Sequence, residues 1–278
     1  DAVVYDAQGC AYLYEAKQDE IKLGGCALAV AALTEYMDVF QSKTHQEVCT
    51  ALGKGILALM DQDSGTFYHV LNGGFTRKEE FRTIYYDGEA AFALCRLYGL
   101  TEDPLWLAAA ESAVGHFIAA DYAQYKDCWV AYTMNEMTKY LPDRPEYYTF
   151  ALENARNCLE DITRQDTAYH TYLELLLNTF ELYDRMVQNG GAAEGFDLRP
   201  FLSAICTRAD RQLNDYFYPE YAMYMQNPQR IVDTFMVRQD GFRVRIDDVQ
   251  HNISGCYLYC VNYEKLVQYG MLVCAGLI

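Results

Sequence analysis

Acidic residues and histidines stand at the starts of several apolar helical segments, where their side chains are placed for acid/base chemistry. Asp87 and Glu89 open one such segment, and Asp127 and Asp248 take corresponding places in two later ones. His251 follows Asp248 by three residues, which puts both on one helical face. One protonated and one ionised carboxylate cleave a glycosidic bond, whereas a base beside an activated carbon supports epimerisation or elimination. The candidate catalytic residues are therefore Glu89, Asp248, Asp87, Asp127 and His251.

Aromatic, histidine and arginine side chains near these positions are candidates for binding a substrate. Aromatic residues make up 14% of the chain, including 25 tyrosines, and offer flat surfaces on which sugar rings stack. Arg243 and Arg245 are two apart on an apparent strand and therefore point to the same side. They would hold the carboxylate of a uronic acid by bidentate pairs, or form salt bridges with nearby carboxylates such as Asp247 and Asp248. The candidate substrate-binding residues are Trp129, Tyr86, His170, His69, Arg238, Arg243 and Arg245.

Each candidate also has a structural interpretation. Asp87, Asp127 and Asp247 suit the N-caps of helices, and Glu89 complements the dipole of a helix N-terminus. Three further candidates equally suit packed or solvent-exposed positions in which the side chain has no chemical role: His69, Trp129 and His170.

The spacing of apolar residues predicts helices that come in pairs. In each pair the first helix is more uniformly apolar and the second more amphipathic, which predicts an inner and an outer layer. Residues 65–86 and 216–246 alternate aromatic and polar residues, which indicates β-hairpins or extended loops. Thr44 and Glu47 have the spacing of a capping box. The predicted helices cover 21–40, 45–60, the segment from Asp87, 104–120, 127–140, 145–161, 167–188, 198–215 and a last helix from Asp247 past Tyr263.

Two concentric layers of paired helices predict an all-α toroid with short β insertions at one rim. A chain of 278 residues is long enough for one large core, so a single domain over residues 1–278 is expected. An open solenoid is the competing architecture, but solenoid repeats usually keep a more regular period than the intervals of about 40–60 residues that separate these pairs.

This layout resembles the (α/α)6-toroid proteins of carbohydrate metabolism, which include six-hairpin glycosidases, N-acylglucosamine 2-epimerases and glucuronyl C5-epimerase-like proteins. The resemblance in helical layout covers most of the chain, although lanthionine and terpenoid cyclases share its motif of helix, turn and helix. It implies a funnel at the ends of the inner helices, where catalytic acids and stacking aromatics lie. The stretches that carry it are Tyr86-Asp87-Gly88-Glu89-Ala90, Leu97-Tyr98 and Thr101-Glu102-Asp103-Pro104-Leu105-Trp106-Leu107-Ala108-Ala109-Ala110.

Composition excludes several classes of partner. The formal net charge of −17 repels nucleic acid and anionic membrane surfaces, and no apolar run approaches the roughly 18–20 residues of a membrane span. Zinc-type Cys/His spacings and phosphate-cradling glycine loops are absent from the sequence, so no metal and no cofactor is expected. Many of the ten cysteines fall in apolar helical segments, as buried free thiols do.

The same features bear on the compartment. Free thiols and the absence of a signal-peptide pattern in Asp1-Ala2-Val3-Val4-Tyr5 favour the cytoplasm. Removal of a signal sequence would instead place the protein outside it.

The sequence therefore predicts a carbohydrate-active protein, with a glycoside hydrolase as the leading hypothesis. In this hypothesis Glu89 and Asp248 share the acid/base work while Asp127 and His251 orient the reacting groups. A sugar epimerase or polysaccharide lyase is the alternative. A non-catalytic toroid that binds a glycan, peptide or protein is the alternative of another class. The sequence does not indicate the oligomeric state.

Overall fold

The computed structural model describes residues 2–78, 82–165 and 169–275. Thr167, near the start of one predicted helix, lies outside them. The chain divides into two compact units, one formed by residues 1–122 and 132–143 and the other by 123–131 and 144–278. Each unit is described by itself below.

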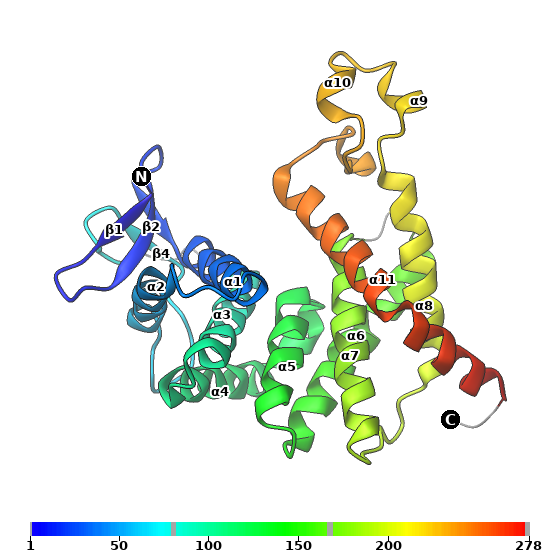
Figure 1. The fold of residues 1–278 in the computed structure, drawn as a ribbon, viewed down its shortest axis with the longest axis horizontal. Helices are drawn as coiled ribbons and strands as arrows, with labels where there is room; N and C mark the ends of the chain where they lie inside the picture. The colour runs from blue at the N-terminus through cyan, green and yellow to red at the C-terminus, as the bar shows by residue number, and fades with distance from the viewer. Residues whose placement is uncertain (1, 79–81, 166–168, 276–278) are drawn as a thin grey trace. The chain divides into compact units, whose positions relative to one another are not determined.

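Unit 1 is a set of helices with one small sheet (Figure 1). Helix α1 packs on both α2 and α3, and α3 packs on α4. The α1–α3 contact is made largely of small residues such as Ala27, Ala90 and Ala93, all fully buried, which lets the two helices approach closely. The helices are α1 (Leu23–Val39), α2 (Gln46–Ala58), α3 (Tyr85–Thr101), α4 (Pro104–Ala119) and the later part of α5 (Cys128–Tyr140).

The sheet of unit 1 has the strand order β1-β2-β3-β4, with every neighbouring pair antiparallel. Among the described residues of segment 65–86, which was expected to form a β-hairpin or an extended loop, β4 pairs with β3, where Ile21 lies opposite Leu71, and an isolated antiparallel bridge joins Leu71 to Arg77. The expected alternation therefore marks one strand whose main partner lies near the N-terminus. The strands are β1 (Val3–Tyr5), β2 (Ala11–Glu15), β3 (Glu20–Lys22) and β4 (Val70–Asn72).

Unit 2 is built around α7, whose side chains are buried over most of its length. Helix α7 packs against α11, α6 and α8, because its apolar residues surround the helix rather than forming one stripe. The described helices are α6 (Pro145–Arg164), α7 (Thr171–Gln188), α8 (Leu198–Gln212) and α11 (Ile246–Ala275), together with the first residues of α5. A short 3₁₀ turn, η1 (Tyr122–Tyr125), precedes α5.

The segment between α8 and α11 forms short helical turns rather than the expected hairpin. Pro219 and Pro228 each occupy the first turn of a short helix, where the fixed proline φ suits a helix start. Two isolated β-bridges lie in this segment, one between Tyr216 and Phe235 and one between Val237 and Arg243. The turns are η2 (Leu213–Asp215), α9 (Pro219–Ala222), α10 (Pro228–Ile231) and η3 (Arg238–Asp240).

Three of the predicted helix N-caps are wrong, because the helices begin at other residues than expected. Helix α3 begins two residues before Asp87, and α11 begins one residue before Asp247, so neither aspartate is an N-cap. The predicted capping box at Thr44 is also wrong, because α2 starts after His45 and no side chain caps it. Asp127 does accept a hydrogen bond from the Trp129 N–H at 2.9 Å, as an N-cap would.

Two further expectations concern the whole chain. None of the described helices is long and apolar enough to cross a membrane. Nine of the ten cysteines have side chains that the structure describes, and none of these nine forms a disulfide. The single domain over residues 1–278 stays a prediction.

The cap of α4 gives a test of the fold. Asp103 accepts a hydrogen bond from the Leu105 N–H at 3.0 Å, and Pro104 follows it. Asp103→Ala should lower the free energy of unfolding by about 1 kcal/mol, because one N–H of the first turn loses its acceptor. Urea unfolding followed by circular dichroism measures the loss. The control is Glu153→Ala, which removes an acidic side chain from an exposed position of α6. An equal effect of both substitutions would contradict the assignment of Asp103 as the N-cap of α4.

Candidate functional site

Asp87 is the centre of a buried hydrogen-bond network in unit 1. Its carboxylate accepts from the Tyr122 hydroxyl at 2.9 Å, from Arg82 at 2.6 Å and from His69 Nε2 at 3.0 Å. His69 Nδ1 accepts the Thr83 N–H at 2.8 Å, so the imidazole is neutral and carries its proton on Nε2. Both nitrogens of His69 are therefore engaged. The network joins the segment before α3 to β4 and gives His69 and Asp87 a positioning role.

Glu89 and Tyr86 lie one helical turn apart along the same helix, where α1 starts against α3. A Cβ atom on Gly24 would come within 2.3 Å of a Glu89 carboxylate oxygen and 2.5 Å of the Tyr86 ring. Glycine is thus required for this approach, and Glu89 is only 4% exposed. The Tyr86 ring also lies 5.6 Å from the ring of His69. Unit 1 therefore brings together four predicted site residues: Tyr86, Asp87, Glu89 and His69.

Unit 2 holds a second group, at the N-terminal ends of α5, α7 and α11. His251 lies in the first turns of α11, and a hydrogen bond joins its Nδ1 to Glu174 Oε2, 2.5 Å away. The edge of Trp129 from α5 faces the His251 ring, with centroids 5.8 Å apart. His170, at the N-cap position of α7, lies with its ring 5.5 Å from that of His251.

The pKa values of the two imidazoles are shifted in opposite directions. Burial alone would lower the pKa of His251, but the hydrogen bond and the negative charge of Glu174 outweigh it and raise the pKa above its usual value. Burial and the positive charge of His251 lower the pKa of His170 to about 4, although the Asp248 carboxylate 3.6 Å away favours its protonation. At neutral pH His170 is therefore neutral, while the pKa shift of His251 favours its imidazolium form.

Asp248 stays ionised in this group. It is 2% exposed, and burial would raise its pKa, but hydrogen bonds from Arg245 and the charges of Arg245, His170 and Arg243 lower it. Arg245 binds both oxygens of Asp248 at 3.0 Å, through Nε and Nη2. Arg243 approaches the same carboxylate at 3.5 Å. An ionised, arginine-bound carboxylate suits an orienting role better than that of a general acid.

The arginines form the salt bridges that were one of their two interpretations. Arg243 and Arg245 both face Asp248, although the strand expected to carry them does not form. Arg245 also pairs with Asp247 at 2.8 Å. Arg238 pairs with Asp215 at 2.9 Å, and this ion pair lies outside the histidine group. Unit 2 thus brings together Trp129, His170, Arg243, Arg245, Asp248 and His251, with Asp127 two residues before Trp129.

Glu174 is the residue of this group that sequence reasoning missed. It is fully buried in α7 and stands alone as an acid in the run Tyr172-Leu173-Glu174-Leu175-Leu176-Leu177. A single carboxylate inside so apolar a helix must find a partner. That isolation was the available signal, and the partner itself lies 77 residues further along the chain.

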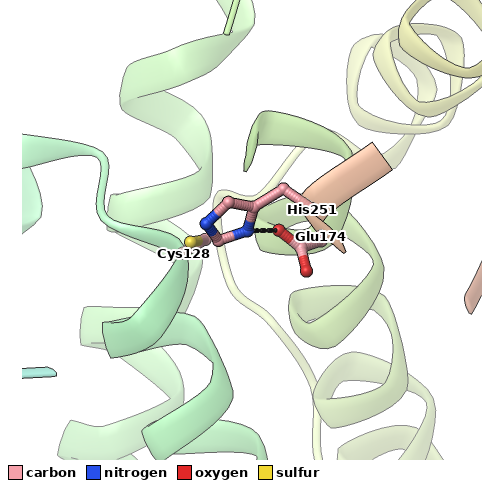
Figure 2. A group of neighbouring side chains, drawn as sticks. All are labelled: Cys128, Glu174 and His251. Atoms are coloured by element: carbon pink, nitrogen blue, oxygen red, sulfur yellow. Dashed lines mark hydrogen bonds and ion pairs between the residues drawn. The ribbon is translucent and has the colours of Figure 1, made fainter. Parts of the chain in front are cut away.

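Three side chains of this group are also arranged to hold a metal ion. Among the described residues, Cys128, Glu174 and His251 form such a group, and their ligand atoms all lie within 4.8 Å of one another. Figure 2 shows the three side chains converging from α5, α7 and α11. Because the residues come from separate helices, no ligand spacing in the sequence indicated them.

Comparison with known proteins identifies the fold. No family model matches the sequence, and no curated protein matches it. The solved structure of cellobiose 2-epimerase from Bacillus thermoamylovorans is similar, with a TM-score of 0.66 and 12% identity, over 92% of this chain and 77% of that one. That protein is an (α/α)6 toroid of the N-acylglucosamine 2-epimerase type. The expected fold class, a toroid of helical hairpins with a small sheet, is therefore confirmed.

The opposite shifts of the two histidines can be measured by NMR titration of the imidazole rings, since the chain has only five histidines. We expect His170 to titrate near pH 4 and His251 above its usual value. His251→Gln should raise the pKa of His170, because it removes a positive neighbour. Glu174→Gln should lower the pKa of His251. Unshifted titration of His170 in His251→Gln would show that the two rings are not coupled.

The raised pKa of His251 also predicts how stability depends on pH. A group whose pKa is higher in the folded state stabilises the fold below its unfolded pKa of about 6.5, and this stabilisation is lost as pH rises through the folded value. The wild type should therefore lose stability in that range relative to Glu174→Gln. Thermal unfolding of both proteins across the range measures the difference, and parallel pH profiles would contradict the linkage.

Proposed function

We propose that this protein is a sugar epimerase that inverts the carbon next to the carbonyl of an aldose at a reducing end. The observation that carries the proposal is the pair His170 and His251, two adjacent imidazoles whose environments shift their pKa values apart. Such pairs provide one base and one acid at the same pH. The structural likeness to a cellobiose 2-epimerase supports the same reaction class and suggests a glucose-containing disaccharide as the first substrate to test.

The chemistry needs a proton removed and a proton returned. In an open-chain aldose the carbonyl at C1 acidifies the C2–H bond, and loss of that proton gives an enediolate. Neutral His170 takes the proton, and the resulting imidazolium faces Asp248 at 3.6 Å. His251, charged and held through Nδ1 by Glu174, donates a proton from Nε2 to the opposite face of C2. The configuration at C2 is then inverted, and the reverse reaction exchanges the two roles.

The other side chains of the group fit supporting roles. Arg245 and Arg243 hold Asp248 beside His170, which fixes the carboxylate that stabilises the charged ring. Trp129 packs its edge against His251 and is almost fully buried. This contact limits rotation of the His251 ring and supports its orientation toward the substrate.

A glycoside hydrolase has less support than an epimerase. Hydrolysis needs one carboxyl group that is protonated at the working pH. The pKa of Asp248 is lowered by its arginine and histidine neighbours, so Asp248 does not supply that proton. The oppositely shifted pair is made of histidines, which suits proton transfer at carbon.

Incubation with cellobiose in D2O tests the proposal. We expect a disaccharide epimeric at C2 of the reducing sugar, with its glycosidic bond intact and one deuterium at C2, because the returned proton comes from a group that exchanges with solvent. His170→Gln and His251→Gln should each lower kcat by roughly 10²–10⁴-fold. NMR of the product mixture gives both the configuration and the deuterium content.

His116→Gln is the matched control, since the His116 ring makes a T-shaped contact with Tyr122 in unit 1 and takes no part in the pair. The His116→Gln variant should keep full activity. Release of two glucose molecules would favour the hydrolase instead. An inert outcome with cellobiose and with a panel of free aldoses would refute the epimerase proposal, provided that the melting profile shows folded protein.

A further inference from the structure

We propose that Cys128, Glu174 and His251 form a binding site for a divalent transition metal, with Zn²⁺ as the preferred ion. One sulfur, one carboxylate oxygen and one imidazole nitrogen lie within 4.8 Å of one another. They come from three helices of the same unit (Figure 2), so packing of the helices holds the ligands together. The proposed epimerase reaction does not use Cys128.

The donor set selects the class of metal. Ca²⁺ and Mg²⁺ prefer oxygen ligands, whereas thiolate and imidazole suit Zn²⁺. Three protein ligands with a fourth position left for water are the usual arrangement of an accessible zinc site. Cys128 and Glu174 are buried, and His251 is partly exposed, so the open position faces the His251 side of the group.

Binding requires a small rearrangement. Glu174 Oε2 and His251 Nδ1 are 2.5 Å apart, whereas two ligands of a tetrahedral Zn²⁺ at about 2.0–2.1 Å are separated by about 3.3 Å. The metal therefore takes the place of the proton between these atoms and moves them apart by roughly 1 Å. It also displaces the thiol proton of Cys128, since the thiolate is the ligand. Each Zn²⁺ bound thus releases the protons carried by Cys128 and His251.

Occupation of the site would also stop the proposed reaction. A metal on Nδ1 of His251 replaces the Nδ1 proton, so the ring is no longer the imidazolium whose Nε2 proton is donated in the proposed reaction. Zn²⁺ should therefore inhibit the epimerase. This consequence rests on the proposed function, whereas the metal site itself does not. Direct binding measured without sugar therefore separates failure of one from failure of the other.

The test is titration of the protein with Co²⁺, followed by its thiolate charge-transfer absorption, and displacement by Zn²⁺. Cys256 and Cys260, one helical turn apart on α11, offer a competing thiol pair, so all variants carry Cys256→Ser and Cys260→Ser. In this background we expect one Co²⁺ per chain. Cys128→Ser should abolish the thiolate band and weaken Zn²⁺ binding by at least about 10–100-fold.

Cys158→Ser, which changes another buried cysteine of the same unit, is the control and should keep the band. Glu174→Gln and His251→Gln should each weaken binding while leaving the Co²⁺–thiolate band detectable at high metal concentration. Far-UV circular dichroism confirms that each variant is folded. A thiolate band that survives Cys128→Ser, or disappears equally with Cys158→Ser, would overturn the site, as would absence of any band in the parent protein.

Discussion

The second unit depends on one buried carboxylate. Glu174 sits without solvent exposure in α7, a helix that is buried over most of its length, where an ion without a partner would cost several kcal/mol. Its Oε2 atom meets Nδ1 of His251, which comes from α11. The hydrogen bond therefore fixes the position of α11 on α7 as well as the orientation of one imidazole. Apolar packing along the two helices supplies the surrounding contact.

This single pair controls the electrostatics of its neighbours. The charge that Glu174 stabilises on His251 is one of the causes that lower the pKa of His170. Asp248 opposes that effect, but its own charge is shared with Arg243 and Arg245. Each charged group in this series thus shifts the pKa of a neighbouring group, and the neutral ring of His170 lies between His251 and Asp248. In unit 1, by contrast, Thr83 and Asp87 engage both nitrogens of the His69 ring.

Much of the helical layout could be predicted because the apolar period is a local signal. The predicted start of the helix at 104 agrees with α4, and the helix from 145 extends only three residues beyond its predicted end, since proline and a polar turn mark these positions. The short strands β1 to β3 were missed because three to five residues carry little periodicity and their pairing is not local. In residues 216–246 the alternating pattern predicted extended structure, whereas Pro219 and Pro228 each begin a short helix there.

The candidate site shows the same division between local and distant information. His170, Asp248 and His251 were selected because they stand near helix starts, and α7 and α11 do bring them together. Glu174 and Cys128 also stand in the first turns of α7 and α5, but a neighbour from another helix is what marks them as possible ligands. Their closeness to His251 makes one imidazole both a proton donor and a metal ligand. A proton and Zn²⁺ compete for Nδ1 of His251, so the Glu174 carboxylate that raises the proton affinity of this ring also favours the metal there. The proposed catalysis and the proposed metal binding are thus two consequences of the same buried Glu174 charge.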